Sequence, residues 1–129
     1  MKLKMLMAVV AITCCSASFA DEVGKLRDMA KDSEEYRELA IDCLIEIKIN
    51  TSSGWESQEC TKYKRFSVTE LQAFKSEIKE ATHAFKSYSK SGESSKKRIK
   101  RGLKQLILIQ ENMESIGNIS ANIKNETKT

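Results

Sequence analysis

No proline occurs anywhere in the 129-residue chain, and this absence constrains the fold more than any other feature of the sequence. Proline breaks helices and marks turns, so a chain without it can form long uninterrupted helices. A β-sandwich needs turn residues after each strand, and the chain offers only five glycines for that purpose. The length allows one small domain and excludes an α/β barrel, which needs about 250 residues. We therefore expect a small all-α protein.

The first twenty residues are typical of a secretory signal peptide rather than of a folded domain. Two lysines precede a mostly apolar stretch over residues 3–15, and small residues at Ser18 and Ala20 fit a cleavage site. The apolar stretch is well short of the roughly 20 residues that a membrane-spanning helix needs. We expect cleavage between Ala20 and Asp21 and no transmembrane segment. A lipoprotein signal at Cys14 is a weaker alternative.

Residues 21–129 retain two cysteines, Cys43 and Cys60. In an oxidising compartment an isolated pair usually forms a disulfide, and two separate buried thiols are the alternative. A bridge of this span would remove roughly 3 kcal/mol of unfolded-chain entropy. The chain has one histidine and no CxxC motif, which leaves too few ligands for zinc. We expect no metal and no other cofactor.

Apolar residues recur every three or four positions in three segments, which predicts three helices, or four if the first one breaks near Asp32. Residues 21–49 form the first segment. The second has a heptad-like seam at Leu71, Phe74, Ile78, Ala81, Phe85 and Tyr88. The third has an apolar stripe at Ile99, Leu103, Leu106, Ile109, Met113 and Ile116, widened by Ile107 and Leu108. The predicted fold is a small three- or four-helix bundle closed by the disulfide.

Capping residues predict where the second helix begins. Residues 50–66 are expected to form a polar connector that contains Trp55, the only tryptophan. Ser67 and Glu70 have the spacing of a capping box, and the apolar residues on either side, Phe66 and Leu71, complete a hydrophobic staple. Trp55 either anchors a binding partner, since tryptophan is enriched at binding hot spots, or covers the end of the core.

The third helix is expected to begin after Ser95, which can serve as its N-cap. Gly117 and the asparagine after it are typical of a helix end. We therefore assign residues 21–117 to the helical domain and residues 118–129 to a flexible C-terminal tail.

Charge is divided unevenly along the chain. Residues 21–59 carry 11 acidic and 5 basic side chains, whereas residues 86–104 carry 8 basic side chains and a single acid, Glu93. One interpretation is that the basic third helix lies beside the acidic first helix. The other is an external partner with an anionic surface: an acidic protein, a glycan or lipid headgroups. The residues that would bind it are Lys96, Lys97, Arg98, Lys100, Arg101 and Lys104.

The aliphatic continuation of this run, residues 103–109, would suit membrane insertion if it were exposed, but burial in the bundle explains it equally well. Nucleic acid is a poorer candidate partner, because few aromatic residues accompany the basic run. Arg98, Lys100 and Arg101 also resemble the recognition site of furin-type proprotein convertases, with cleavage before Gly102. A helix at this place would resist such cleavage.

N-glycosylation sequons begin at Asn50, Asn118 and Asn125, all in segments expected to be loops or tail. They favour an extracellular glycoprotein over a bacterial periplasmic protein. No catalytic motif is present, and His83, the single histidine, has no nucleophile signature around it. We therefore expect no enzymatic activity.

The leading hypothesis is a secreted, non-enzymatic protein that binds or modulates another macromolecule, as an extracellular ligand or inhibitor does, through the basic helix face. A bacterial periplasmic inhibitor or immunity-type protein is the bacterial counterpart of this hypothesis. The alternative is a carrier of a small apolar ligand in the helical core. The residues expected to line such a cavity are Phe74, Ile78, Phe85, Leu106 and Met113.

Overall fold

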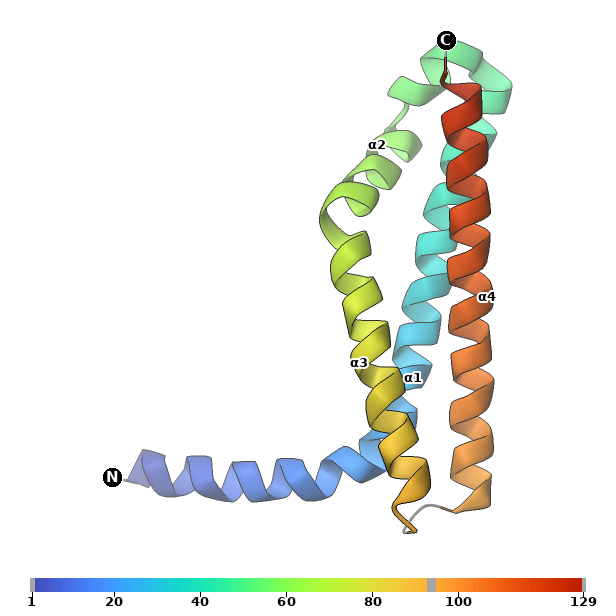
Figure 1. The fold of residues 1–129 in the computed structure, drawn as a ribbon. Helices are drawn as coiled ribbons and strands as arrows, with labels where there is room; N and C mark the ends of the chain where they lie inside the picture. The colour runs from blue at the N-terminus through green and yellow to red at the C-terminus, as the bar shows by residue number, and fades with distance from the viewer. Residues whose placement is uncertain (1, 93–94, 129) are drawn as a thin grey trace.

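The computed structural model describes residues 2–92 and 95–128. Its elements are α1 (Lys2–Asn50), the 3-10 helix η1 (Thr51–Glu56), α2 (Gln58–Arg65), the π-helical turn η2 (Phe66–Glu70), α3 (Leu71–Lys90) and α4 (Lys96–Glu126). Because α2, η2 and α3 follow one another directly, the chain makes three long helical passes, up, down and up (Figure 1). The described residues contain no strand. The predicted small helical bundle is confirmed.

The first and last passes, α1 and α4, run parallel and pack mainly against each other (Figure 1). Two side-chain contacts fix their relative height. Asn112 Nδ2 donates to Ser33 Oγ at 3.0 Å between residues 79 apart, and Lys48 Nζ donates to Glu126 Oε1 at 2.6 Å between residues 78 apart. A residue on α1 is therefore level with the residue 78 or 79 positions later on α4.

Apolar side chains form two core clusters, one in each half of the bundle. The lower cluster joins all three passes through Leu26, Met29, Ala30, Phe74, Ala81, Phe85, Tyr88, Leu106 and Ile109. The upper cluster contains Ala40, Cys43, Ile47, Cys60, Tyr63 and Ile123. The hydrogen bond between Ser33 and Asn112 is buried between α1 and α4, and it satisfies two polar groups that would otherwise be costly to bury.

The disulfide between Cys43 and Cys60 is confirmed, and it links α1 to α2. The question of a break near Asp32 is also answered, because α1 continues through this residue. Ser33, its neighbour, does not act as a cap. Its hydroxyl donates to the Ala30 carbonyl at 2.7 Å within the helix.

The expected polar connector over residues 50–66 is wrong, because η1 and α2 are both helical. Ser57 caps α2, and its Oγ accepts from the Cys60 N–H at 3.2 Å. The capping box at Ser67 is wrong for the same reason, since the chain is already helical there and Ser67 Oγ donates to the Lys64 carbonyl. Phe66 is buried and stacked on Tyr36, which holds this turn in the helix.

The expected flexible tail over residues 118–129 is contradicted up to Glu126, where α4 ends. Gly117 does not stop the helix. Ile116, Ile119 and Ile123 continue the apolar stripe past it at helical spacing, and Ile123 is buried in the upper cluster. The contact between Lys48 and Glu126 ties down the last turn.

At the other end, α1 begins at Lys2, and its first part bends away from the bundle (Figure 1). No helix in the described part of the chain is long and apolar enough to cross a membrane. Cleavage between Ala20 and Asp21 stays a prediction.

Candidate functional site

The candidate site is built on the first turns of α4, which begin at a confirmed cap. Ser95 has an extended backbone, with φ −85° and ψ 151°, and its Oγ accepts from the Arg98 N–H at 3.2 Å. The Ser95 carbonyl accepts from the Ile99 N–H at 3.0 Å. The helix therefore starts with Lys96, and the basic residues that follow occupy regular helical positions.

The inner side of these turns is fixed by a glycine against an aromatic ring. Gly102 is buried, and a Cβ placed on it would collide with the ring of Phe85 on α3. Ile99 and Leu106 pack on the same lower cluster. Close contact with α3 on this side, and packing against α1 on the neighbouring side, leave the remaining surface of these turns facing outward.

The outward surface carries the basic cluster, which we define as Lys96, Lys97, Arg98, Lys100, Arg101 and Lys104. All six side chains are exposed. None of the ion pairs found among the side chains of residues 22–92 and 95–128 includes a member of the basic cluster. Lys86 and Lys90, also exposed, lie in the last two turns of α3. This end of α3 is at the same end of the bundle as the start of α4 (Figure 1).

The helix register explains why most acidic residues of α1 do not neutralise this cluster. With the offset of 78 or 79 residues, Lys100 is level with Glu22 of α1. Asp28, slightly higher, forms an ion pair with Arg27 rather than with the basic cluster. Most acids of α1, from Asp32 to Glu46, are level with residues 110–125 of α4 instead. At 1.5 Å per residue, the centres of the two charged runs are separated along the axis by roughly 25 Å, more than twice the screening length at 0.1 M salt.

One basic residue of α1 extends the cationic surface. A hollow of about 230 Å³ lies between the two helices, lined by Val23, Gly24, Arg27, Arg98, Arg101 and Gln105. It brings three guanidinium-bearing residues to one place, and guanidinium is the group that best pairs with phosphate, sulfate or carboxylate. Sequence analysis missed Arg27, because it belongs to a segment that is acidic overall.

Three aliphatic side chains are exposed beside the basic cluster, and we call them the apolar ridge. Leu103, Ile107 and Leu108 retain 49%, 52% and 46% of their exposed area. The expectation that Leu103 belongs to the buried stripe is wrong, because Gly102 occupies the inward position and turns Leu103 outward. Leu106 and Ile109 are buried, so the aliphatic run is divided between core and surface.

Trp55 lies at the opposite end of the bundle and partly covers the upper cluster. Lys64 Nζ lies 4.0 Å from the centre of its ring and donates to its carbonyl oxygen at 2.7 Å. These contacts agree with the interpretation of Trp55 as a cover for the end of the core.

The sequon asparagines also lie away from the basic cluster. Asn50, Asn118 and Asn125 are exposed, the first at the upper end of α1 and the other two on α4. Asn118 is about 21 Å along the helix axis from Lys104. The expectation that Asn118 and Asn125 lie in a loop or tail is wrong, because both are helical.

The convertase-like residues Arg98, Lys100 and Arg101 lie within α4, and the residue after them, Gly102, is buried. A protease that binds an extended segment would have to unwind these turns. Cleavage at this motif stays a prediction that the helical structure disfavours.

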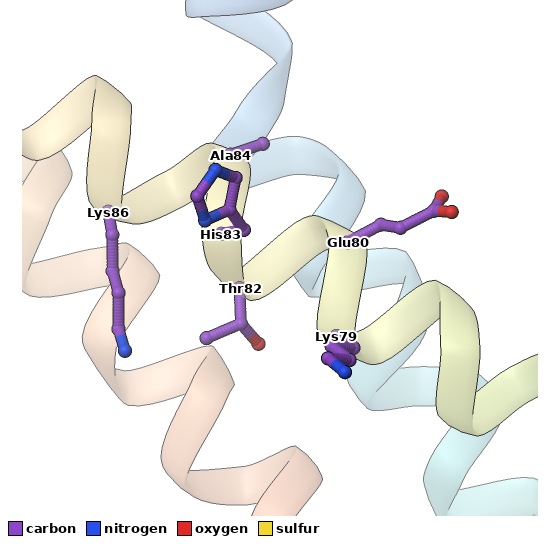
Figure 2. Close-up of a pocket in the computed structure, with 6 residues that line it drawn as sticks. All are labelled: Lys79, Glu80, Thr82, His83, Ala84 and Lys86. Carbon is purple, nitrogen blue, oxygen red and sulfur yellow. The ribbon is translucent and has the colours of Figure 1, made fainter.

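His83 is exposed on α3, beside a surface hollow of about 590 Å³ lined by Lys79, Glu80, Thr82, His83, Ala84 and Lys86 (Figure 2). All six lining residues come from one helix. Among the residues that the structure describes, no group of three or more His, Cys, Asp and Glu side chains could hold a metal ion.

The pKa of Tyr36 is raised above its ordinary value. The main cause is burial of the side chain, followed by the nearby carboxylates of Glu70 and Asp32.

The residues suggested for an apolar ligand cavity lie in the lower core cluster. Phe74, Phe85 and Leu106 are buried there, and Ile78 and Met113 pack against it. These side chains pack against one another in the space between the helices.

No protein-family model, no curated protein and no solved structure matches the chain significantly.

Proposed function

We propose that this is a secreted, non-enzymatic protein that binds an anionic macromolecular surface through the basic cluster on α4. The observation that carries the proposal is six exposed cations placed where they disfavour folding. The first turn of α4 contains no acid and three cations, at the end where the helix dipole is positive. Like charges three and four residues apart repel one another further. An arrangement that costs stability is typical of a surface kept for binding.

Four other observations support this proposal. The acidic run of α1 from Asp32 to Glu46 lies higher in the bundle, and no ion pair among the described side chains includes a member of the basic cluster. Arg27, which forms an exposed ion pair with Asp28 at 3.8 Å, adds a further guanidinium from the neighbouring helix. The candidate glycosylation sites lie toward the other end, so glycans there would leave the basic cluster open. The Cys43–Cys60 disulfide is compatible with an oxidising, extracellular or periplasmic compartment.

The test is retention on a sulfated-glycan column, with protein purified from cells that express the full chain. We expect retention to fall sharply when all six members of the basic cluster are changed to glutamine, because the positive field is lost. The matched control changes six exposed basic residues elsewhere to glutamine, so that net charge falls equally. These residues are Lys31, Lys62, Arg65, Lys75, Lys79 and Lys124.

The control variant is expected to elute close to the wild-type protein and far later than the cluster variant. Equal elution of the two variants would mean that only net charge matters, and the proposal would then be wrong. A folded helical spectrum for both variants ensures that the comparison concerns binding.

A further inference from the structure

We propose that the anionic partner is a lipid bilayer and that the apolar ridge inserts between its headgroups. This inference rests on the proposed function, since it assigns a partner class to the same surface. Leu103 and Ile107, four residues apart, share the outer side of α4 with Lys100 and Lys104. Leu108 lies about 140° around the helix from Leu103 and lines a hollow against α1. Lys100 and Lys104 are each three residues from a ridge residue, Leu103 and Ile107 respectively, so cation and aliphatic side chain are neighbours on the helix surface.

The exposed aliphatic residues distinguish a bilayer from the other anionic partners. A sulfated glycan offers nothing apolar, so it would leave Leu103, Ile107 and Leu108 about half exposed in the complex. An acidic protein would pair with the arginines of this surface, but leucine is under-represented in the hot spots of protein interfaces, so such a partner would not account for the apolar ridge. A bilayer satisfies both parts of the surface, with phosphate and carboxylate groups for the cations and hydrocarbon for the ridge.

The shape and position of the surface fit a flat partner. Figure 1 shows α4 on the outside of the bundle, with its first turns at one end. The lysines there have long aliphatic stems, so their ammonium groups can reach the headgroup layer while the ridge inserts below it. The hollow lined by Arg27, Arg98 and Arg101 lies beside this surface and offers guanidinium groups to a lipid phosphate.

The test is co-sedimentation with vesicles of phosphatidylcholine, with and without phosphatidylserine. We expect the full-chain product to bind only the vesicles with phosphatidylserine. Three variants are compared: the cluster variant, a ridge variant (Leu103→Gln, Ile107→Gln and Leu108→Gln), and a control that changes Ile45 and Ile49 on α1 to glutamine. Like the ridge residues, the two control isoleucines are aliphatic and exposed, at 47% for Ile45 and 69% for Ile49, but they lie far from the basic cluster.

The cluster variant is expected to lose binding, and the ridge variant to bind more than about tenfold more weakly, because it loses aliphatic burial. The Ile45 and Ile49 control is expected to bind as the wild-type protein does. A ridge variant that binds vesicles as tightly as the wild type would overturn insertion. Cluster-dependent retention on the sulfated glycan, without vesicle binding, would leave the proposed function standing and refute the lipid assignment. If the cluster variant bound the glycan column and the vesicles as the wild-type protein does, the proposed function and the lipid assignment would both be refuted.

Discussion

Two glycines lie within α4, and they look alike in the sequence but not in the structure. Gly102 faces the Phe85 ring so closely that a Cβ would collide with it, whereas a Cβ on Gly117 would meet nothing within 4 Å. The first glycine lets α3 and α4 approach each other beneath the basic cluster. The second has no packing role, and its only effect on the helix is the entropic cost of a flexible residue.

We expect Gly102→Ala and Gly117→Ala to change stability in opposite directions. The first should lower the free energy of unfolding by about 1–3 kcal/mol, because the Phe85 ring has to move within a packed core. The second should raise it by about 0.5–1 kcal/mol, the helix propensity gained from glycine to alanine. Urea unfolding followed by circular dichroism measures both. Stabilisation by both substitutions would show that Gly102 has room and that the contact with Phe85 is not close.

At the scale of the helices, the beginning of the second pass is the clearest difference between expectation and structure. Ser67 and Glu70 have capping-box spacing, yet the helix begins ten residues earlier at Ser57. A capping motif describes only local bonds. Burial of Phe66 against Tyr36 and the disulfide at Cys60 hold the preceding segment in helical form, and neither effect is visible in a four-residue pattern.

Substitution of the two serines should separate the true cap from the apparent one. Ser57→Ala removes the oxygen that accepts from the Cys60 N–H, and we expect a loss of about 1 kcal/mol in unfolding free energy. Ser67→Ala removes only a hydroxyl that bonds back to the Lys64 carbonyl within a continuous helix, so we expect a change within about 0.5 kcal/mol. A larger loss at Ser67 than at Ser57 in urea unfolding would contradict this assignment.

The helices themselves were predictable because their apolar spacing repeats over many turns. Phe74, Phe85 and Tyr88 are buried as the seam requires, and the Ser95 cap and the disulfide are present. Features that depend on a partner helix were not predictable. Nothing near Asn112 in the sequence shows that it bonds Ser33, and Leu103 is outward only because Gly102 packs on Phe85.

At the scale of the whole molecule, the distribution of charge also depends on contacts between helices that the sequence does not show. The sequence identifies the six residues of the basic cluster but not whether the acids of α1 neutralise them, because that depends on the relative height of two helices. The contacts of Ser33 with Asn112 and of Lys48 with Glu126 set this height. They place the acidic run and the basic run at different levels, so the protein has a cationic lower end and an acidic middle.

This separation predicts how the basic cluster affects folding. If the acids of α1 paired with it, neutralising the six cations would destabilise the bundle. Because most of them lie higher in the bundle, the variant loses mainly mutual repulsion at i, i+3 and i, i+4 spacing and an unfavourable interaction with the helix dipole. We therefore expect the six-residue glutamine variant to unfold with a free energy higher by about 1–2 kcal/mol at low salt. In urea unfolding at about 1 M salt the difference should shrink, since the screening length falls to about 3 Å.

A variant less stable than the wild type at low salt would contradict this prediction. It would mean that the basic cluster pairs with acids inside the molecule and is therefore not free to bind an external partner.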